Sequence, residues 1–526
     1  MSLLAGTATI ALVGAACSSD EEAAAAEAAT EFIAASTPLY VEGSTDFEGA
    51  QWTQAEALLS RFPNAPPEGI TDVLNDAFED EGIDYETQVR PLLGETAVLG
   101  ATPEVPTSLE GLNVSDATDS VDDTSVVAAL ELAEGAEDQA RELLTDEADV
   151  TEVGEHEGNA IYESRDGDTF VSVVSGAIVL SDTRAGLERA IDAQRSGGDA
   201  TLGGSDKFNA AVGRLPEDTF GKIYIDIGAF LEQAAAEDPD SAESLRQLGD
   251  FSQLALAASV TTEEQGIRLQ GVIEGAPDGA EATAFSPTLL QDAPADAIAY
   301  VGFAGLANSV SQAVQQLRES ETNEELGMQL DAVTGQLPAL LGVTVDDLGA
   351  LTSGEHAVVV AAPGGAPAGA LALQVEDGAR AEMTLDALRG ATPLAGPQIG
   401  LPPDAEWSQV QLANGVQGWQ IPLQDGLNAV YGVDGDLAVI GTSPQIVRQV
   451  QNPGQTLADD ADFQTATQGM PDEITGLLWL DPPELLDAAE RGGALDAGDQ
   501  EGIDTPRTFE GIAAWTVDGD VPTFEV

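Results

Sequence analysis

Cysteine and histidine are almost absent from this chain. Its 526 residues include one cysteine, Cys17, and two histidines, His156 and His356. A single thiol excludes an internal disulfide, and a cysteine nucleophile in the body of the chain is excluded by the count. His156 begins the sequence HEGNA, but Ala160 stands where a zinc-binding HExxH helix requires its second histidine. Both histidines are therefore expected to be exposed or structurally hydrogen-bonded, and no metal or cofactor is expected.

Basic residues are scarce as well. The chain has 18 Lys and Arg against 93 Asp and Glu, a formal net charge of −75, and Lys207 and Lys222 are its only lysines. Such a surface repels nucleic-acid phosphates, so no nucleic-acid partner is expected. An excess of acid with few lysines keeps a protein soluble in salt, where ions screen the self-repulsion. This composition predicts a saline or alkaline habitat, with the general acidity of exported proteins as the alternative.

Long apolar runs and familiar catalytic motifs are also missing. No stretch of about 20 apolar residues follows residue 20, which excludes a membrane-spanning helix in the body. No GxSxG elbow, P-loop or dinucleotide-binding glycine motif occurs, so hydrolase and nucleotide-binding functions lack support. Acidic clusters such as residues 116–123 lack the spacing of a calcium-binding loop. We therefore expect a protein that is not an enzyme.

The single cysteine follows an apolar, uncharged N-terminal segment. Residues 1–17 read MSLLAGTATIALVGAAC, and the acidic segment SSDEEAAAAEAATE follows directly. Small residues leading into a cysteine resemble the bacterial lipobox, in which the thiol receives a diacylglycerol and the chain is cut before the cysteine. Cys17 is therefore the predicted lipidation site and membrane anchor. No Lys or Arg precedes the apolar run, which predicts that the true start codon lies upstream.

An internal repeat is the clearest sign of organisation in the body. Four blocks recur in the same order, with offsets that fall from 260 to 255 residues. This pattern predicts a duplicated module. The equivalent positions include Tyr40/Tyr300, Gly94/Gly354, Gly176/Gly435, Phe208/Phe463, Asp226/Asp481, Tyr162/Trp419 and Tyr224/Trp479. The paired aromatic residues are expected to pack in the core or across strands rather than to form ligand platforms.

Each module shows strand, hairpin and helix signals without a regular βαβ rhythm. The runs TFVSVVSGAIVLS and NAVYGVDGDLAVIGT predict hairpins, as does Asn414-Gly415 between two apolar runs. KIYIDIGAF, LALAASVTT and GIRLQGVIEG alternate with the period of a strand. Helices are predicted at Trp52–Phe62, around Val310, and after each hairpin. The expected fold class is α+β: two tandem homologous modules, each a mostly antiparallel sheet with hairpins packed by helices.

These blocks resemble a known family. ASTPLYVEGSTDFEGAQWTQAEALLSRFP, VRPLLGETAVLG and GAIVLSDTRAGLERAIDA are similar to actinobacterial exported proteins catalogued as domain of unknown function 3352. The resemblance covers nearly the whole chain after residue 36, and it implies a secreted or lipid-anchored protein without an established activity. The predicted organisation is a signal peptide (1–16), a lipidated cysteine with an acidic tether (17–36), module 1 (37–278), a linker (279–292) and module 2 (293–526).

The sequence as a whole predicts a location more firmly than an activity. We expect a lipid-anchored protein on the extracytoplasmic face of the cell membrane, held by Cys17, with a non-enzymatic role in binding or envelope organisation. The alternative is a carrier for an apolar or lipid ligand held between sheet and helices. A hydrolase with unfamiliar carboxylates is a third interpretation. The protein or lipid partner is not identified by any motif.

Overall fold

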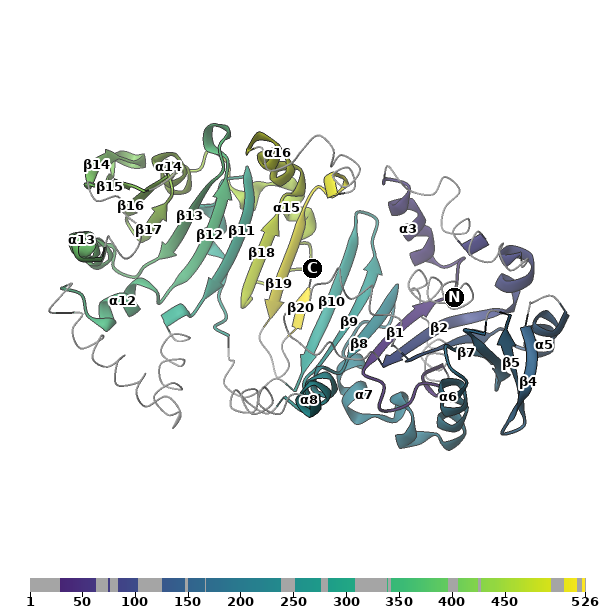
Figure 1. The fold of residues 1–526 in the computed structure, drawn as a ribbon. Helices are drawn as coiled ribbons and strands as arrows, with labels where there is room; N and C mark the ends of the chain where they lie inside the picture. The colour runs from purple at the N-terminus through teal and green to yellow at the C-terminus, as the bar shows by residue number, and fades with distance from the viewer. Residues whose placement is uncertain are drawn as a thin grey trace. The chain divides into compact units, whose positions relative to one another are not determined.

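The computed structural model divides the chain into two compact units, which are described separately (Figure 1). Unit 1 holds Met1–Ala280 with Gly519–Glu525, and unit 2 holds Glu281–Asp518 with Val526. Cys17, the acidic cluster at 116–123 and the helix predicted around Val310 lie outside the described residues. The structure describes residues 29–62, 74–75, 84–102, 125–146, 150–165, 167–237, 251–275, 282–307, 338, 342–395, 405–423, 427–492, 506–517 and 523–525.

Unit 1 is built on one antiparallel sheet. Its strands lie in the order β4-β5-β6-β7-β3-β2-β1-β8-β9-β10, and the last strand of the chain, β20, pairs with β10. The strands are β1 (Leu39–Ser44), β2 (Leu93–Thr102), β3 (Ser125–Leu132), β4 (Val150–His156), β5 (Asn159–Ser164), β6 (Phe170–Val174), β7 (Ala177–Ser181), β8 (Gly221–Ile225), β9 (Ala255–Thr262), β10 (Ile267–Glu274) and β20 (Thr523–Glu525).

Unit 2 repeats this arrangement. Its strands lie in the order β14-β15-β16-β17-β13-β12-β11-β18-β19, and all the pairings are antiparallel. The strands are β11 (Ala297–Ala304), β12 (Glu355–Ala361), β13 (Ala368–Gln374), β14 (Ser408–Gln411), β15 (Gln417–Pro422), β16 (Asn428–Asp434), β17 (Leu437–Gly441), β18 (Gly476–Leu480) and β19 (Ile512–Val517). This order matches the run from β4 to β9 in unit 1, and β10 is an additional strand at the end of the unit 1 sheet. The agreement confirms the predicted α+β fold with two similar modules.

Helices pack on both sheets. In unit 1 these are α3 (Ala50–Leu59), α5 (Glu137–Asp146), α6 (Arg184–Ser196), α7 (Asp206–Val212) and α8 (Ile227–Glu237), with short turns η1 (Tyr85–Val89), η2 (Arg90–Leu92), η5 (Gly198–Ala200) and η6 (Leu202–Gly204). Unit 2 has α12 (Val345–Leu351), α13 (Gly378–Ala395), α14 (Pro444–Gln451), α15 (Ala461–Ala466) and α16 (Pro482–Gly492), with η7 (Thr288–Gln291), η9 (Pro363–Gly365), η10 (Ala413–Gly415), η12 (Leu457–Asp459) and η13 (Pro506–Thr508).

The predicted hairpins form where the turn residues place them. Ser175 and Gly176 connect β6 to β7 with positive φ angles of 45° and 79°, and Gly435 turns β16 into β17 with a φ of 64°. Asn414 and Gly415 also have positive φ, at 55° and 82°, between β14 and β15. Asn and Gly tolerate this conformation at little steric cost, which is why these dipeptides mark turns.

A helix follows each of the two central hairpins, as the periodicity predicts. Thr183 caps α6 by accepting a hydrogen bond from the Gly186 N–H, and Ser443 caps α14 in the same way through Ile446. The helices then bury the expected apolar residues, Leu187 with Ile191 in α6 and Ile446 with Val450 in α14. The caps satisfy backbone donors that have no partner inside a helix, and the apolar face fixes the helix to the sheet.

One predicted strand is too long. The sequence KIYIDIGAF alternates throughout, but β8 ends at Ile225 and α8 begins at Ile227. Asp226 explains the change, because its Oδ1 accepts the backbone N–H of Ala229 at 2.8 Å and so caps the new helix. Period-two alternation cannot distinguish a strand that continues from one that meets a helix cap.

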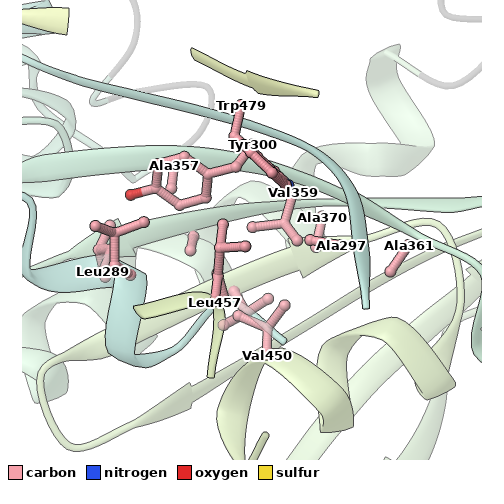
Figure 2. Packing of buried hydrophobic residues seen from close by; sticks show 14 of the residues in the cluster. Leu289, Ala297, Tyr300, Ala357, Val359, Ala361, Ala370, Val450, Leu457 and Trp479 are labelled. Atoms are coloured by element: carbon pink, nitrogen blue, oxygen red, sulfur yellow. The ribbon is translucent and has the colours of Figure 1, made fainter. Parts of the chain in front are cut away.

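Aromatic residues occupy the centre of the main core in each unit. Tyr40 on β1 lies opposite Tyr224 on β8, and Phe208 of α7 packs edge-on against both rings, with centroids 5.1 and 5.0 Å away. In unit 2, Tyr300 lies opposite Trp479, and Phe463 packs edge-on against that indole at 5.4 Å. Figure 2 shows Tyr300 and Trp479 among the alanine, valine and leucine side chains of this core. Tyr224 and Trp479 are thus core residues, as expected.

A polar network borders the core of unit 1. The Tyr40 hydroxyl donates to Glu42 Oε2 at 2.7 Å, and the Lys222 ammonium lies 3.0 Å from Glu42 Oε1. The side chains of Lys222 and Glu42 are only 16% and 12% exposed. Burial and the nearby Glu42 carboxylate raise the pKa of Tyr40, so this hydroxyl stays protonated and donates.

Residues before the predicted start of module 1 already belong to its core. Phe32 and Ile33, within the predicted tether, are buried against α6 and α7 residues, and the Leu202 N–H donates to the Ile33 carbonyl at 2.8 Å. In unit 2 the Leu457 N–H donates to the Ala293 carbonyl at the same distance. The repeat therefore includes residues 29–36 and their counterparts 289–296. Phe32 and Ile33 are hard to recognise as core residues in the sequence, because alanine and acidic residues surround them.

Candidate functional site

An open cleft with acidic walls lies in unit 1. It has a volume of about 900 Å³ and lies among the loop that follows β1, the turns η1 and η2, the start of β2 and the end of β3. Its charged lining consists of Asp46, Glu48, Glu86, Glu95, Glu131, Glu134 and Arg90. Six carboxylates and one guanidinium give this acidic cleft a strongly negative potential, and concave walls concentrate such a field.

The loop after β1 forms one wall and is held by short hydrogen bonds. The Thr45 hydroxyl donates to the Gly94 carbonyl at 2.6 Å, and the Thr45 N–H donates to the Glu95 carbonyl at 2.8 Å. Phe47 packs on Trp52 of α3, with ring centroids 4.5 Å apart. These contacts leave Glu48 with a side chain that is 90% exposed at the mouth of the cleft.

The opposite wall contains a carboxylate that replaces a strand hydrogen bond. The register of β2 against β3 shifts between Leu93 and Ala97, which frees backbone donors. Glu131 Oε2 accepts the Glu95 N–H at 3.2 Å in their place. A Cβ added at Gly94 would lie 2.8 Å from Glu131 Cγ, so glycine is the residue that lets this side chain cross the strand. Burial, and next the Glu95 charge, raise the pKa of Glu131, against the lowering effect of its backbone hydrogen bonds.

Arg90 is the cation of the acidic cleft. Its guanidinium lies 3.8 Å from both Glu48 and Glu86 and stands over the Phe47 ring at 5.8 Å from the centroid. Ion pairs at this distance and exposure contribute little to stability, about 0–1 kcal/mol. Arg90 compensates only a part of the negative charge, so the acidic cleft retains a net attraction for cationic ligands.

The carboxylate that the sequence repeat aligns with Glu95 has a structural role in unit 2. Glu355, 260 positions after Glu95, is only 4% exposed. It accepts hydrogen bonds from the backbone N–H groups of Thr288 and Leu289 and from the Thr288 hydroxyl at 2.6 Å. Burial raises the pKa of Glu355, although these hydrogen bonds oppose the shift. Glu355 thus anchors η7 to the sheet and does not contribute to an exposed acidic wall.

The two histidines belong to different units, and each makes structural contacts. His156 ends β4, and its Nε2 lies 2.8 Å from Asp192 Oδ1 on α6. His356 is fully buried on β12, with Nε2 3.1 Å from the Thr352 carbonyl oxygen. The HEGNA segment forms a hairpin turn at Glu157-Gly158, with φ angles of 50° and 89°, instead of a helix. Within the ranges that the structure describes, no group of three His, Cys, Asp or Glu side chains is placed to hold a metal ion.

The second aromatic pair lies in equivalent strands with different neighbours. Tyr162 on β5 is buried, whereas Trp419 on β15 is half-buried beneath the guanidinium of Arg389, which lies 3.8 Å from its ring centroid. The Arg389 Nε donates to the Tyr431 hydroxyl at 2.9 Å, and that hydroxyl donates to Asp386 at 2.6 Å. The stacked guanidinium holds α13 against the sheet, which is the packing role predicted for Trp419.

No local sequence signal points to the acidic cleft. Its carboxylates come from four separate segments, and 93 acidic residues in the chain make any single one uninformative. The available clue is the Gly94-Glu95 pair, which recurs as Gly354-Glu355 in the second copy. That recurrence cannot show that Glu95 is exposed and Glu355 buried.

These features define a protein of two similar α+β units on antiparallel sheets, with an open acidic cleft in the first. The chain belongs to the family described as protein of unknown function (DUF3352), whose model matches residues 1–494. This match confirms the resemblance seen in the sequence. No curated protein and no solved structure matches the chain. No helix in the described part of the chain is both long and apolar enough to cross a membrane.

Proposed function

We propose that this protein is a lipid-anchored, non-enzymatic binding protein on the extracytoplasmic face of the cell membrane. The anchor is a diacylglycerol on Cys17, supported by the small residues before this cysteine and the acidic segment after it. Because Ala29, Phe32 and Ile33 are buried in the core of unit 1, the tether is shorter than the predicted residues 17–36. Eleven residues separate Cys17 from Ala29 and span at most about 40 Å.

The acidic cleft is the observation that supports a binding role. It is open, about 900 Å³ in volume, and lined by six carboxylates that the chain only partly neutralises. A polar, negatively charged cleft attracts ligands with several positive charges, such as a lysine-rich peptide, and it repels anions. The alternative of an apolar carrier gains no support from this cleft, because its walls offer carboxylates rather than a continuous apolar lining.

Metabolic labelling tests the anchor. Cells that express the wild-type protein with a palmitate analogue should yield a labelled membrane-associated protein, and Cys17→Ser should lose both the label and the membrane association. Cys17 is the sole cysteine, so no other thiol can take up the acyl group. Equal labelling of the two proteins would contradict the anchor.

Peptide titration tests the acidic cleft. A tetralysine peptide is titrated into the protein at physiological ionic strength, and Glu48→Gln with Glu134→Gln should weaken binding roughly three- to ten-fold, the effect of two partly screened charges. Asp472→Asn with Glu473→Gln is the matched control, because both residues are exposed in unit 2 and the net charge changes equally. If the two double variants weaken binding by the same factor, the peptide follows overall charge and the acidic cleft is not its site.

A further inference from the structure

The cation of the acidic cleft stands on an aromatic ring. The guanidinium carbon of Arg90 lies 5.8 Å from the centroid of the Phe47 ring, and both residues line the cleft. The Phe47 ring also packs on Trp52, with centroids 4.5 Å apart, and meets Tyr85 edge-on at 5.9 Å. Trp52 and Tyr85 are each 1% exposed, so the ring rests on buried neighbours. Phe47 therefore presents a well-positioned aromatic surface to a cation in the cleft.

Two carboxylates flank the same guanidinium at a distance longer than a hydrogen bond. Glu48 Oε1 and Glu86 Oε1 each lie 3.8 Å from a terminal nitrogen of Arg90. Direct charge-assisted hydrogen bonds between such groups are about 2.7–2.9 Å long. The Arg90 side chain is 33% exposed, and those of Glu48 and Glu86 are 90% and 51% exposed. Because exposed pairs of this kind contribute only about 0–1 kcal/mol, displacing the Arg90 guanidinium costs little.

Unit 2 forms the corresponding strands without this ring and this cation. The repeat aligns Phe47 with Ala307 and Arg90 with Ala350, at the offset of 260 residues that also relates the glycines before Glu95 and Glu355. The strands that correspond to β1 and β2 pair in unit 2 as β11 and β12. The Phe47 ring and the Arg90 guanidinium are therefore not required to build the sheet, which leaves them available for binding.

We infer that Arg90 is a built-in competitor for the ligand of the acidic cleft. Its guanidinium occupies the position between the Phe47 ring and the carboxylates of Glu48 and Glu86, and an arginine side chain of a peptide ligand takes this position by displacing it. This role rests on the proposed binding function of the acidic cleft, and it makes a guanidinium the preferred ligand group over an ammonium. A planar guanidinium stacks on an aromatic face and donates to two carboxylates at once, whereas an ammonium is a more strongly hydrated point charge.

Calorimetric titration of the full chain with tetraarginine and tetralysine peptides, at physiological ionic strength, tests the competition. Arg90→Gln removes the competing guanidinium and should tighten tetraarginine binding roughly three- to ten-fold. Arg214→Gln is the matched control, because it changes the net charge equally at a residue that pairs with Glu274 and does not line the cleft. The control should change the affinity by less than about two-fold, since salt screens a distant charge. Equal tightening in the two variants would show that only net charge matters and would overturn the inference.

A second variant separates the ring from the charge. In Arg90→Gln, tetraarginine should bind roughly two- to five-fold more tightly than tetralysine, the effect of one stacked guanidinium. Adding Phe47→Leu keeps an apolar side chain against Trp52 but removes the aromatic face, so this preference should disappear. Adding Phe170→Leu instead, at a half-buried ring outside the cleft lining, should leave the preference unchanged.

The outcomes distinguish this inference from the proposed function. A preference for tetraarginine that survives Phe47→Leu refutes the displacement by a stacked guanidinium, while peptide binding itself still supports the acidic cleft as a cation site. If neither peptide binds to the wild type or to Arg90→Gln, the proposed binding role of the acidic cleft fails, and the competition by Arg90 fails with it.

Discussion

Tyr300 on β11 lies directly opposite Trp479 on β18, and the same two positions in unit 1 hold Tyr40 and Tyr224. All four side chains are at most 2% exposed. The duplication has therefore kept the geometry of an aromatic cross-strand pair while one ring changed from phenol to indole. Such a pair adds directional ring contacts to the burial of a large apolar area, which makes it a natural centre for each sheet.

Removing the Trp479 indole should lower the stability of unit 2 more than a substitution at its surface. Trp479→Ala leaves a cavity beside Tyr300 and Phe463, and we expect a loss of about 3–5 kcal/mol in the free energy of unfolding. Urea denaturation followed by circular dichroism measures it. Leu478→Ala, the adjacent residue with a 41% exposed side chain, is the control and should cost below about 1 kcal/mol. Similar losses for both variants would argue against Trp479 as the core residue described.

Gly511 should not tolerate a methyl group. A Cβ at this position would overlap the Trp479 ring, which is rigid and buried, so either the ring or the chain must move. We expect Gly511→Ala to destabilise unit 2 by about 1–3 kcal/mol. Gly454→Ala is the matched control, because a Cβ there has no atom within 4 Å. Thermal melts of the two variants give the comparison, and an unchanged midpoint for Gly511→Ala would contradict this packing.

The charge of Glu131 should oppose folding at neutral pH. Its pKa is raised above the ordinary 4.5, so the folded state favours the protonated form. The resulting stabilisation is fully present below the ordinary value and disappears as the pH rises through the raised pKa. Glu131→Gln keeps an oxygen that can accept the Glu95 N–H, and we expect it to be more stable than wild type by a few tenths of a kcal/mol at pH 7.

The pH dependence distinguishes this effect from a simple change in net charge. The advantage of Glu131→Gln should shrink as the pH falls toward 4, because the wild-type carboxylate then takes up its proton. Glu134→Gln removes a charge from the same cleft and is the control. Urea midpoints between pH 4 and 8 measure both variants. An advantage of Glu131→Gln that does not vary with pH would contradict the assignment.

Arg389 should stabilise unit 2 through the stacking of its planar guanidinium as well as through its charge. Lysine keeps the charge but loses the stacking on Trp419 and the Nε donation to Tyr431. We expect Arg389→Lys to cost about 1 kcal/mol and to change the tryptophan emission of the folded protein. Arg448→Lys, at an exposed hydrogen bond to the Gln411 carbonyl, should change neither beyond about 0.5 kcal/mol. Unchanged emission in Arg389→Lys would contradict the stacked geometry.

Much of the fold could be predicted because the duplication repeats the sequence pattern of many helices and strands. Gly176 and Gly435 mark the same hairpin twice, and Leu187 and Ile446 mark the same helix. The boundaries of the modules are harder to predict from the sequence, because Phe32 and Ile33 are core residues that belong to no periodic pattern. The boundary between β8 and α8 depends on one side-chain cap at Asp226, which alternation does not encode.

The acidic cleft could not be predicted in the same way. It gathers carboxylates from distant segments, and acidic side chains are abundant throughout this chain. What separates Glu131 from other acids is the register shift in β2, a tertiary feature.

The placement of the two lysines has a practical consequence. Lys207 and Lys222 are each only 16% exposed and paired with a carboxylate in unit 1. Amine-directed reagents, including common crosslinkers and biotin esters, should therefore modify the folded body slowly, and unit 2 offers them no side chain at all. A lysine introduced at position 472, which is exposed, would give unit 2 a unique chemical handle.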